Sequence, residues 1–98
     1  EEAQRIMDRI ALTAMSPDSS ITVTGHTDDV PISNGQFRDN WDLGAGRAAS
    51  VVQAIQNTGL ISGDRMSAVS KGEMAPLADN NTAAGRKQNR RIEIEISY

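Results

Sequence analysis

The chain has 98 residues, a net charge of −3 and 38% hydrophobic residues, with a single Trp, a single Tyr and a single Phe. This length fits one domain spanning residues 1–98, with a small core of mainly aliphatic side chains. The negative charge disfavours general attraction to nucleic acid or to anionic lipid.

Two absences narrow the class of protein further. The chain contains no cysteine, which excludes disulfides and thiolate metal sites. No apolar run approaches the ~20 residues that a membrane-spanning helix needs. The sequence starts at Glu1 without an initiator methionine, so we expect it to be a piece of a longer protein.

The first part of the chain predicts a helix followed by a strand. Residues 1–15 place apolar side chains on one helical face, and residues 16–19, which include Pro17, predict a turn. Residues 20–26 alternate and are rich in β-branched side chains, which is typical of a strand.

A long loop follows at residues 29–39. Its Asn34-Gly35 pair is a turn signal. We expect Phe37 and Trp41 to hold the loop against the domain, and a loop anchored in this way is more often functional than idle.

Residues 40–58 predict a second helix, with Asn40 as its N-cap and Gly59 at its C-terminal end. At about 100° per residue, one continuous face should be buried; it holds Leu43, Arg47, Val51, Ala54 and Ile55. Arg47 would then lie in the middle of that face, where a guanidinium needs an anionic partner. Asp28 is the leading candidate, either in a structural ion pair or in a charged pocket for a zwitterionic ligand.

The second half predicts a strand at residues 65–70, a loop at 71–81 and a helical turn at 82–89. The last segment alternates: Ile92, Ile94 and Ile96 should face inward, and Glu93, Glu95 and Ser97 outward. The order of elements predicts an α+β two-layer sandwich, with helices packed on one face of a mixed β-sheet.

Several motifs, in this order, resemble the OmpA-like peptidoglycan-binding domain: GHTD at 25–28, Asn40-x-x-Leu43, Arg47-Ala48 and Gly85-Arg86-x-x-Asn89-Arg90-Arg91. The segment from Pro31-Ile32 through Phe37 to Asn40-Trp41 is similar to the version in flagellar stator proteins of the MotB type. The resemblance implies a strand before the first helix of the family fold, and we expect this strand to be missing from this sequence. Two positions depart from the family pattern: Gly44, where the family usually has Ser, and Ser70, where it often has Gly.

The resemblance implies a binding site for stem peptides that contain meso-diaminopimelate, whose free end carries an ammonium beside a carboxylate. It transfers the family's binding pair to Asp28, for the ammonium, and Arg47, whose planar fork matches a carboxylate. The N-terminus of the helix after Asn40 would add backbone N–H groups for that carboxylate. The other ligand-binding residues that it implies are Thr27, Asn40, Leu43, Asn89 and Arg90.

The spacing of His26 and Asp28 suggests an alternative of another class, a metal-assisted cell-wall hydrolase. A single histidine and no cysteine disfavour a transition-metal site, and no Ser nucleophile has a recognisable base beside it. We therefore expect no catalysis, no metal and no cofactor.

Four basic residues near the C-terminus form a cluster: Arg86, Lys87, Arg90 and Arg91. We expect a solvated turn whose arginines pair with Glu93, Glu95 or the carboxylates of the pocket loop. A nucleic-acid site would need more positive charge and stacking aromatics.

The expected function is to anchor a membrane complex to the cell wall by binding peptidoglycan in the periplasm. The resemblance implies a flagellar motor stator, a homodimer with an ion-channel partner subunit, attached to the inner membrane through a segment outside this sequence. The alternative within the same class is the anchoring domain of an outer-membrane protein or lipoprotein.

Overall fold

The computed structural model of the protein describes residues 2–16 and 18–98. Its elements follow in the order α1 (Glu2–Thr13), β1 (Ser20–His26), α2 (Asn40–Gln56), a 3₁₀ turn (Gly63–Arg65), β2 (Met66–Gly72), α3 (Ala83–Asn89) and β3 (Ile92–Ser97). Every predicted helix and strand is present, and the 3₁₀ turn is an addition. Glu1 of the predicted first helix and Pro17 of the predicted turn lie outside the described residues.

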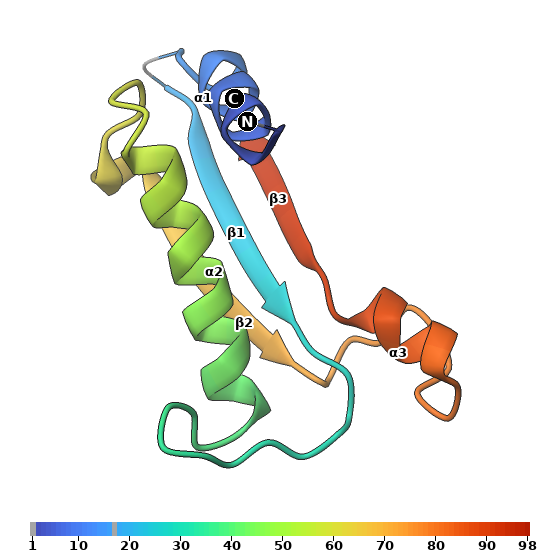
Figure 1. Ribbon diagram of the computed structural model, residues 1–98. Helices are drawn as coiled ribbons and strands as arrows, with labels where there is room; N and C mark the ends of the chain where they lie inside the picture. The colour runs from blue at the N-terminus through green and yellow to red at the C-terminus, as the bar shows by residue number, and fades with distance from the viewer. Residues whose placement is uncertain (1, 17) are drawn as a thin grey trace.

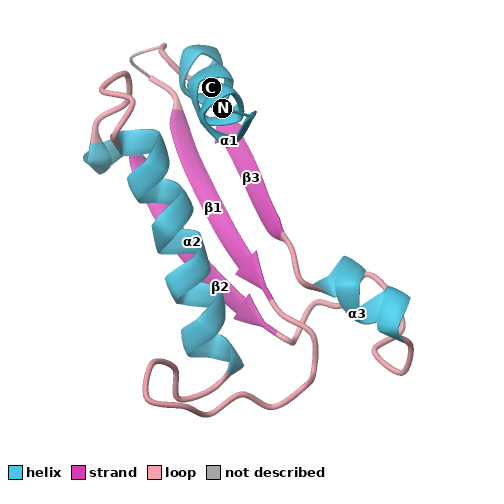
Figure 2. Ribbon diagram, in the orientation of Figure 1, coloured by secondary structure: helices cyan, strands magenta, loops and turns pink. Residues whose placement is uncertain are grey.

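The strands of the described chain form one mixed sheet in the order β2-β1-β3 (Figures 1 and 2). β1 runs parallel to β2 and antiparallel to β3. Val23 of β1 lies between Ala68 of β2 and Ile94 of β3, so alternate side chains of the three strands share one face. α1 and α2 lie over that face, whereas α3 lies beyond the start of β3 (Figure 1). The predicted α+β architecture is confirmed.

The core is small and aliphatic, as the composition predicts. Its buried hydrophobic side chains come from both large helices, from β1 and from the segment after α2: Ala11, Ala14, Ile21, Val23, Ala48, Ile55 and Ile61. The isoleucines of β3 pack against this core, and Glu93 and Glu95 are exposed, as predicted. No helix in residues 2–16 and 18–98 has the length and apolarity of a membrane span.

Arg65 ties the end of α1 to the start of β1. Its guanidinium donates to Ser19 O at 3.0 Å and to Ala14 O and Ser16 O at 2.6 Å each, and it contacts the Ser19 hydroxyl. Carbonyl groups at the end of a helix lack partners within the helix. One side chain therefore satisfies several of them and holds α1 at the amino-terminal end of the sheet.

α2 is rotated relative to the predicted orientation. Its buried residues are Asn40, Gly44, Ala48 and Ile55, whereas Leu43 and Arg47 are only partly buried, at the edge of this face. The prediction that Arg47 occupies the middle of the buried face is therefore wrong. The cause is side-chain size, because glycine and alanine allow the helix backbone to approach the sheet closely.

The ends of α2 also differ from the prediction. Asp39 is the N-cap, and its side chain accepts a hydrogen bond from Asp42 N at 2.9 Å, so Asn40 is already the first helical residue. The Asp42 amide is thus not free for a ligand carboxylate, contrary to the expectation for this helix N-terminus. Asn57 is the C-cap, and Gly59, with a φ of +76°, lies two residues beyond it.

The predicted anchors of the long loop are present. Asn34 Oδ1 accepts hydrogen bonds from Gln36 N at 2.8 Å and from Phe37 N at 2.7 Å, which makes the predicted turn. The Phe37 ring packs over Gly46 of α2 and holds the loop against the helix. Trp41 lies beside Gly72 at the end of β2.

Gly25 of β1 and Gly44 of α2 meet backbone to backbone. A Cβ atom at Gly25 would overlap the carbonyl oxygen of Gly44, and a Cβ atom at Gly44 would overlap the Ser70 hydroxyl of β2. Gly44 and Ser70 are the two positions that depart from the family pattern, and they are in contact. The serine side chain that the family usually has at position 44 of the helix is absent here, and the Ser70 side chain of the sheet occupies that space instead.

This contact predicts that Gly44→Ser and Ser70→Gly are coupled. Gly44→Ser alone should lower the free energy of unfolding by about 2 kcal/mol, because the new side chain is overpacked against Ser70. Ser70→Gly alone should lower it by about 1 kcal/mol through backbone entropy. The loss of unfolding free energy in the double variant should be smaller than the sum of the two single losses by about 1 kcal/mol, as measured by urea denaturation.

Gly35→Ser is the control, since no atom lies within 4 Å of a Cβ at that loop position. Strictly additive losses of stability in the double variant would show that positions 44 and 70 do not compensate for each other.

Candidate functional site

Three segments meet at the carboxyl ends of β1 and β2: the loop after β1, the first turn of α2, and α3 (Figure 1). Thr27 N donates to Gly72 O at 2.9 Å, which joins the two strand ends. Ligands often bind at the carboxyl ends of parallel strands, because loops from different segments converge there.

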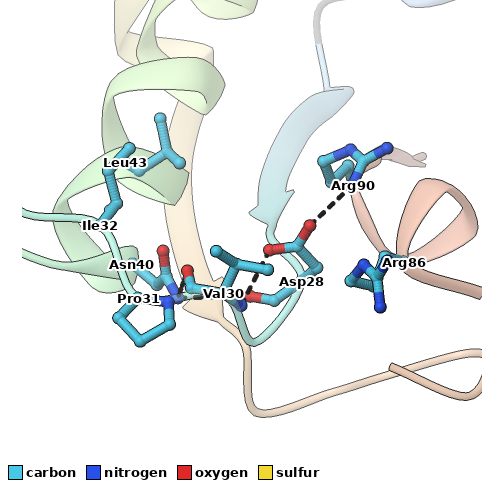
Figure 3. Close-up of a pocket in the computed structure, with 8 residues that line it drawn as sticks. All are labelled: Asp28, Val30, Pro31, Ile32, Asn40, Leu43, Arg86 and Arg90. Carbon is cyan, nitrogen blue, oxygen red and sulfur yellow. Dashed lines mark hydrogen bonds and ion pairs between the residues drawn. The ribbon is translucent and has the colours of Figure 1, made fainter. Parts of the chain in front are cut away.

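A cavity of about 370 Å³ lies at this junction. Figure 3 shows its charged side chains, Asp28, Arg86 and Arg90, on one side. Opposite them lie the apolar side chains of Pro31, Ile32 and Leu43 together with Asn40, and Val30 lies between the two sides. A ligand that combines charged groups with a short aliphatic chain matches this lining.

Asp28 is the central charged group of the cavity, and its side chain is only 11% exposed. Both of its carboxylate oxygens have partners. Oδ1 accepts a hydrogen bond from Val30 N at 3.0 Å, and Oδ2 accepts one from Arg90 Nη1 at 2.7 Å (Figure 3). The short distance to Arg90 is typical of a charge-assisted hydrogen bond.

Asn40 and Thr27 hold the backbone around Asp28. Asn40 is buried, and its Nδ2 donates to Asp28 O at 3.2 Å and to Val30 O at 3.1 Å. The Thr27 hydroxyl donates to Asp28 O at 2.7 Å. Asn40 also lines the cavity, whereas Thr27 does not.

The predicted ion pair between Asp28 and Arg47 is not formed, because Arg90 takes that place. Arg47 Nη1 instead donates a long hydrogen bond to His26 O at 3.5 Å, and Arg47 has no ion-pair partner among the described residues. The rotation of α2 moves Arg47 to the edge of the helix–sheet contact. It lies one helical turn from Leu43 and is not among the residues that line the cavity.

Asn89 has a different place from the one that the family motif implied, because its side chain does not reach the cavity. It is completely buried. Oδ1 accepts from Leu77 N at 2.8 Å and Ala78 N at 3.0 Å, and Nδ2 donates to Ala78 O at 3.0 Å and Asn80 Oδ1 at 2.7 Å. These bonds use the hydrogen-bonding capacity of the amide, so Asn89 holds the loop before α3 in place.

Arg86 lines the cavity, although the sequence reasoning did not select it for ligand binding. Its Nη1 donates to Asn80 O at 2.9 Å. It lies four residues before Arg90, and this spacing brings both side chains to one side of α3. That spacing within the basic motif was the signal available in the sequence.

His26 belongs to a second cluster, on the opposite side of β1 from α2. Its side chain is 4% exposed, and Nε2 lies 3.5 Å from Glu93 Oε1. Arg91 Nε donates to the other oxygen of Glu93 at 2.7 Å. The basic cluster thus pairs as predicted, Arg91 with Glu93 and Arg90 with Asp28. The described ranges contain no group of three or more His, Cys, Asp or Glu residues arranged to hold a metal ion.

The surroundings of His26 favour its neutral form. Burial lowers the pKa of His26, the Arg91 guanidinium and the Lys71 ammonium lower it as well, and the Glu93 carboxylate opposes them. Neither ring nitrogen has a hydrogen-bond partner in the described part of the chain. The hydrogen bond from Arg91 lowers the pKa of Glu93 and keeps that residue ionised.

Comparison with known proteins agrees with the fold. The model of the OmpA family matches residues 1–90. Motility protein B of Bacillus subtilis is 38% identical over 85 residues, which cover 87% of this chain and 33% of that protein. Peptidoglycan-binding protein ArfA of Mycobacterium bovis is 33% identical over 97 residues, which cover 99% of this chain and 27% of that protein. The chain thus spans a third or less of the length of these two relatives.

A solved structure of similar shape is the C-terminal domain of Helicobacter pylori MotB, residues 125–256. It has a TM-score of 0.87 and 29% sequence identity to this chain, and the match covers 100% of this chain and 75% of that one.

The lowered pKa of His26 predicts a stability that depends on pH. The folded-state pKa lies below the ordinary value of 6.5, so the unfolded chain binds more protons and stability falls as the pH falls through this range. We expect the free energy of unfolding to decrease between about pH 7.5 and about pH 5.5, and to decrease less in His26→Gln. Asp42 and Glu93, whose pKa values are lowered, titrate below this window. The same pH dependence in both proteins, measured by urea denaturation, would rule out His26 as the cause.

Proposed function

Because this chain belongs to the OmpA family, we propose that it binds peptidoglycan non-covalently and acts as an anchor, not as an enzyme. The observation that carries the proposal is Asp28, a nearly buried carboxylate that lines a cavity with both charged and apolar sides. A buried carboxylate needs a cation, and in this structure the partly exposed Arg90 supplies it. A ligand ammonium is a suitable cation, and the apolar side of the cavity accepts the carbon chain beside it.

The proposed ligand is the free end of meso-diaminopimelate in a stem peptide. Asp28 receives its ammonium, and Arg47 receives the neighbouring carboxylate. Arg47 is partly buried and has no ion-pair partner in the described residues, so its guanidinium retains donors for an anion. The methylene groups of the ligand lie against Pro31, Ile32 and Leu43.

Two kinds of support point to the cell wall as the ligand and to a motor stator as the context. The Mycobacterium relative is named a peptidoglycan-binding protein. The Bacillus relative is named a motility protein, and the Pro31–Trp41 loop is similar to that of stator proteins. We propose a periplasmic domain attached to the inner membrane through another segment, in a homodimer that works with an ion-channel subunit.

Asp28→Asn and Arg47→Gln are each expected to reduce retention on purified peptidoglycan by about tenfold or more, because each removes one charge-assisted contact. The measurement is sedimentation of the domain with insoluble peptidoglycan at a fixed salt concentration. Circular dichroism checks that both variants stay folded.

Asp29→Asn is the matched control for Asp28→Asn. Asp29 is the neighbouring carboxylate and is exposed, so its loss changes the net charge equally without altering the cavity. Normal retention of both Asp28→Asn and Arg47→Gln would overturn the proposed site. An equal loss of retention in Asp29→Asn would show that the effect of Asp28→Asn comes from the change in net charge alone.

The stator context is tested in cells whose only copy of the full-length protein carries Asp28→Asn. These cells should assemble flagella and swim poorly, since an unanchored stator cannot apply torque. Normal swimming, with the variant protein present at its usual level, would contradict the proposed role of this domain in motility.

A further inference from the structure

Asp28 and Arg90 form a closed ion pair inside the proposed binding site. Arg90 Nη1 lies 2.7 Å from Asp28 Oδ2, and Asp28 has little exposed surface. A ligand ammonium that approaches this carboxylate comes within a few ångströms of the Arg90 guanidinium, where the two positive charges repel each other. Movement of the Arg90 guanidinium away from Asp28 would therefore favour binding of an ammonium.

Arg90 is held lightly compared with its neighbour. Its guanidinium makes one hydrogen bond within the described chain, to Asp28, and 45% of its side chain is exposed. Arg91 donates through all three of its guanidinium nitrogens, to Glu93 and to two backbone carbonyls. Asn40 and Thr27 hold the backbone around Asp28, and the Arg90 side chain is already 45% exposed, so Arg90 can leave Asp28 for water without unfolding the site.

Arg86 gives the cavity a second positive charge. The lining contains two guanidiniums, those of Arg86 and Arg90, and one carboxylate, that of Asp28, which is paired with Arg90. Arg86 is fixed by its hydrogen bond to Asn80 O at 2.9 Å. If an ammonium replaces Arg90 on Asp28, the Arg90 guanidinium loses its ion-pair partner, and a ligand carboxylate can take that place beside Arg86.

We propose that the Asp28–Arg90 ion pair is a latch that opens fully only for a ligand carrying both charges. The ligand ammonium replaces the Arg90 guanidinium on Asp28, and the freed guanidinium, together with Arg86, binds a carboxylate of the same ligand. This inference rests on the proposed function; it adds Arg86 to the ligand-binding residues and gives Arg90 a defined role on the carboxylate-binding side of the site. A ligand that has an ammonium but no free carboxylate must break the latch and leaves Arg86 and Arg90 unpaired.

The test compares two soluble peptides by isothermal titration calorimetry. One is a stem tripeptide ending in meso-diaminopimelate, and the other is the same peptide with both diaminopimelate carboxylates converted to carboxamides. The unmodified chain should prefer the free acid by about tenfold or more. Arg90→Gln should bind the diamide more tightly than the unmodified chain does, because Asp28 is open, and should bind the free acid more weakly.

Two further variants separate the latch from simpler explanations. Lys87→Gln removes an equal charge from an exposed position of α3 and should keep the preference of the unmodified chain. Arg47→Gln should weaken binding of the free acid without strengthening binding of the diamide, since Arg47 does not block Asp28. A gain for the diamide in Arg90→Gln alone is a result that loss of an ordinary contact cannot produce.

The inference fails if Arg90→Gln, folded and still binding the free acid, binds the diamide no better than the unmodified chain. It also fails if the unmodified chain does not distinguish the two peptides. If the unmodified chain binds neither peptide nor peptidoglycan, the proposed function fails with it, so the two failures are distinguishable.

Discussion

The close backbone contact between Gly25 and Gly44 determines how the ligand end of the domain is built. It presses α2 onto β1 and sets the rotation of the helix. With this rotation, Asn40 is buried under the loop after β1, Leu43 faces the cavity, and Arg47 lies at the border of the helix–sheet contact. A side chain at Gly25 would meet the backbone of Gly44, lift the helix away and move all of these groups together.

Two buried asparagines support the cavity from its two sides. Asn40 holds the turn that carries Asp28, and Asn89 holds the loop that precedes the arginines of α3. An amide side chain supplies donors and an acceptor in a fixed plane, so it can replace the missing strand or helix partners of a loop. The charged groups can then stay accessible while their backbones are rigid, as a binding site requires. Both asparagines belong to the motifs of the family, and the structure gives a reason for each.

The helices and strands could be predicted because their signals are local, as in the alternating isoleucines of β3. The orientation of α2 could not, since a contact made by glycine leaves no apolar pattern. The partner of Asp28 lies 62 residues away at Arg90, and no spacing rule connects positions so far apart. The family motifs nevertheless selected four residues that line one cavity in the structure: Asp28, Asn40, Leu43 and Arg90. They could not separate a cavity residue from one such as Asn89 that supports it, because both lie in the same motif.

The hydrogen bonds of Arg65 to the end of α1 and the start of β1 have a mechanical consequence. They join the end of α1 to one end of β1, and the cavity lies at the other end of that strand (Figure 1). A pull between α1 and a ligand held at the proposed site would therefore run along the strands. The ladder bonds from β1 to β2 and β3 lie across this direction, so they would share the load in shear and would not open one after another. A domain with this geometry is suited to holding under tension.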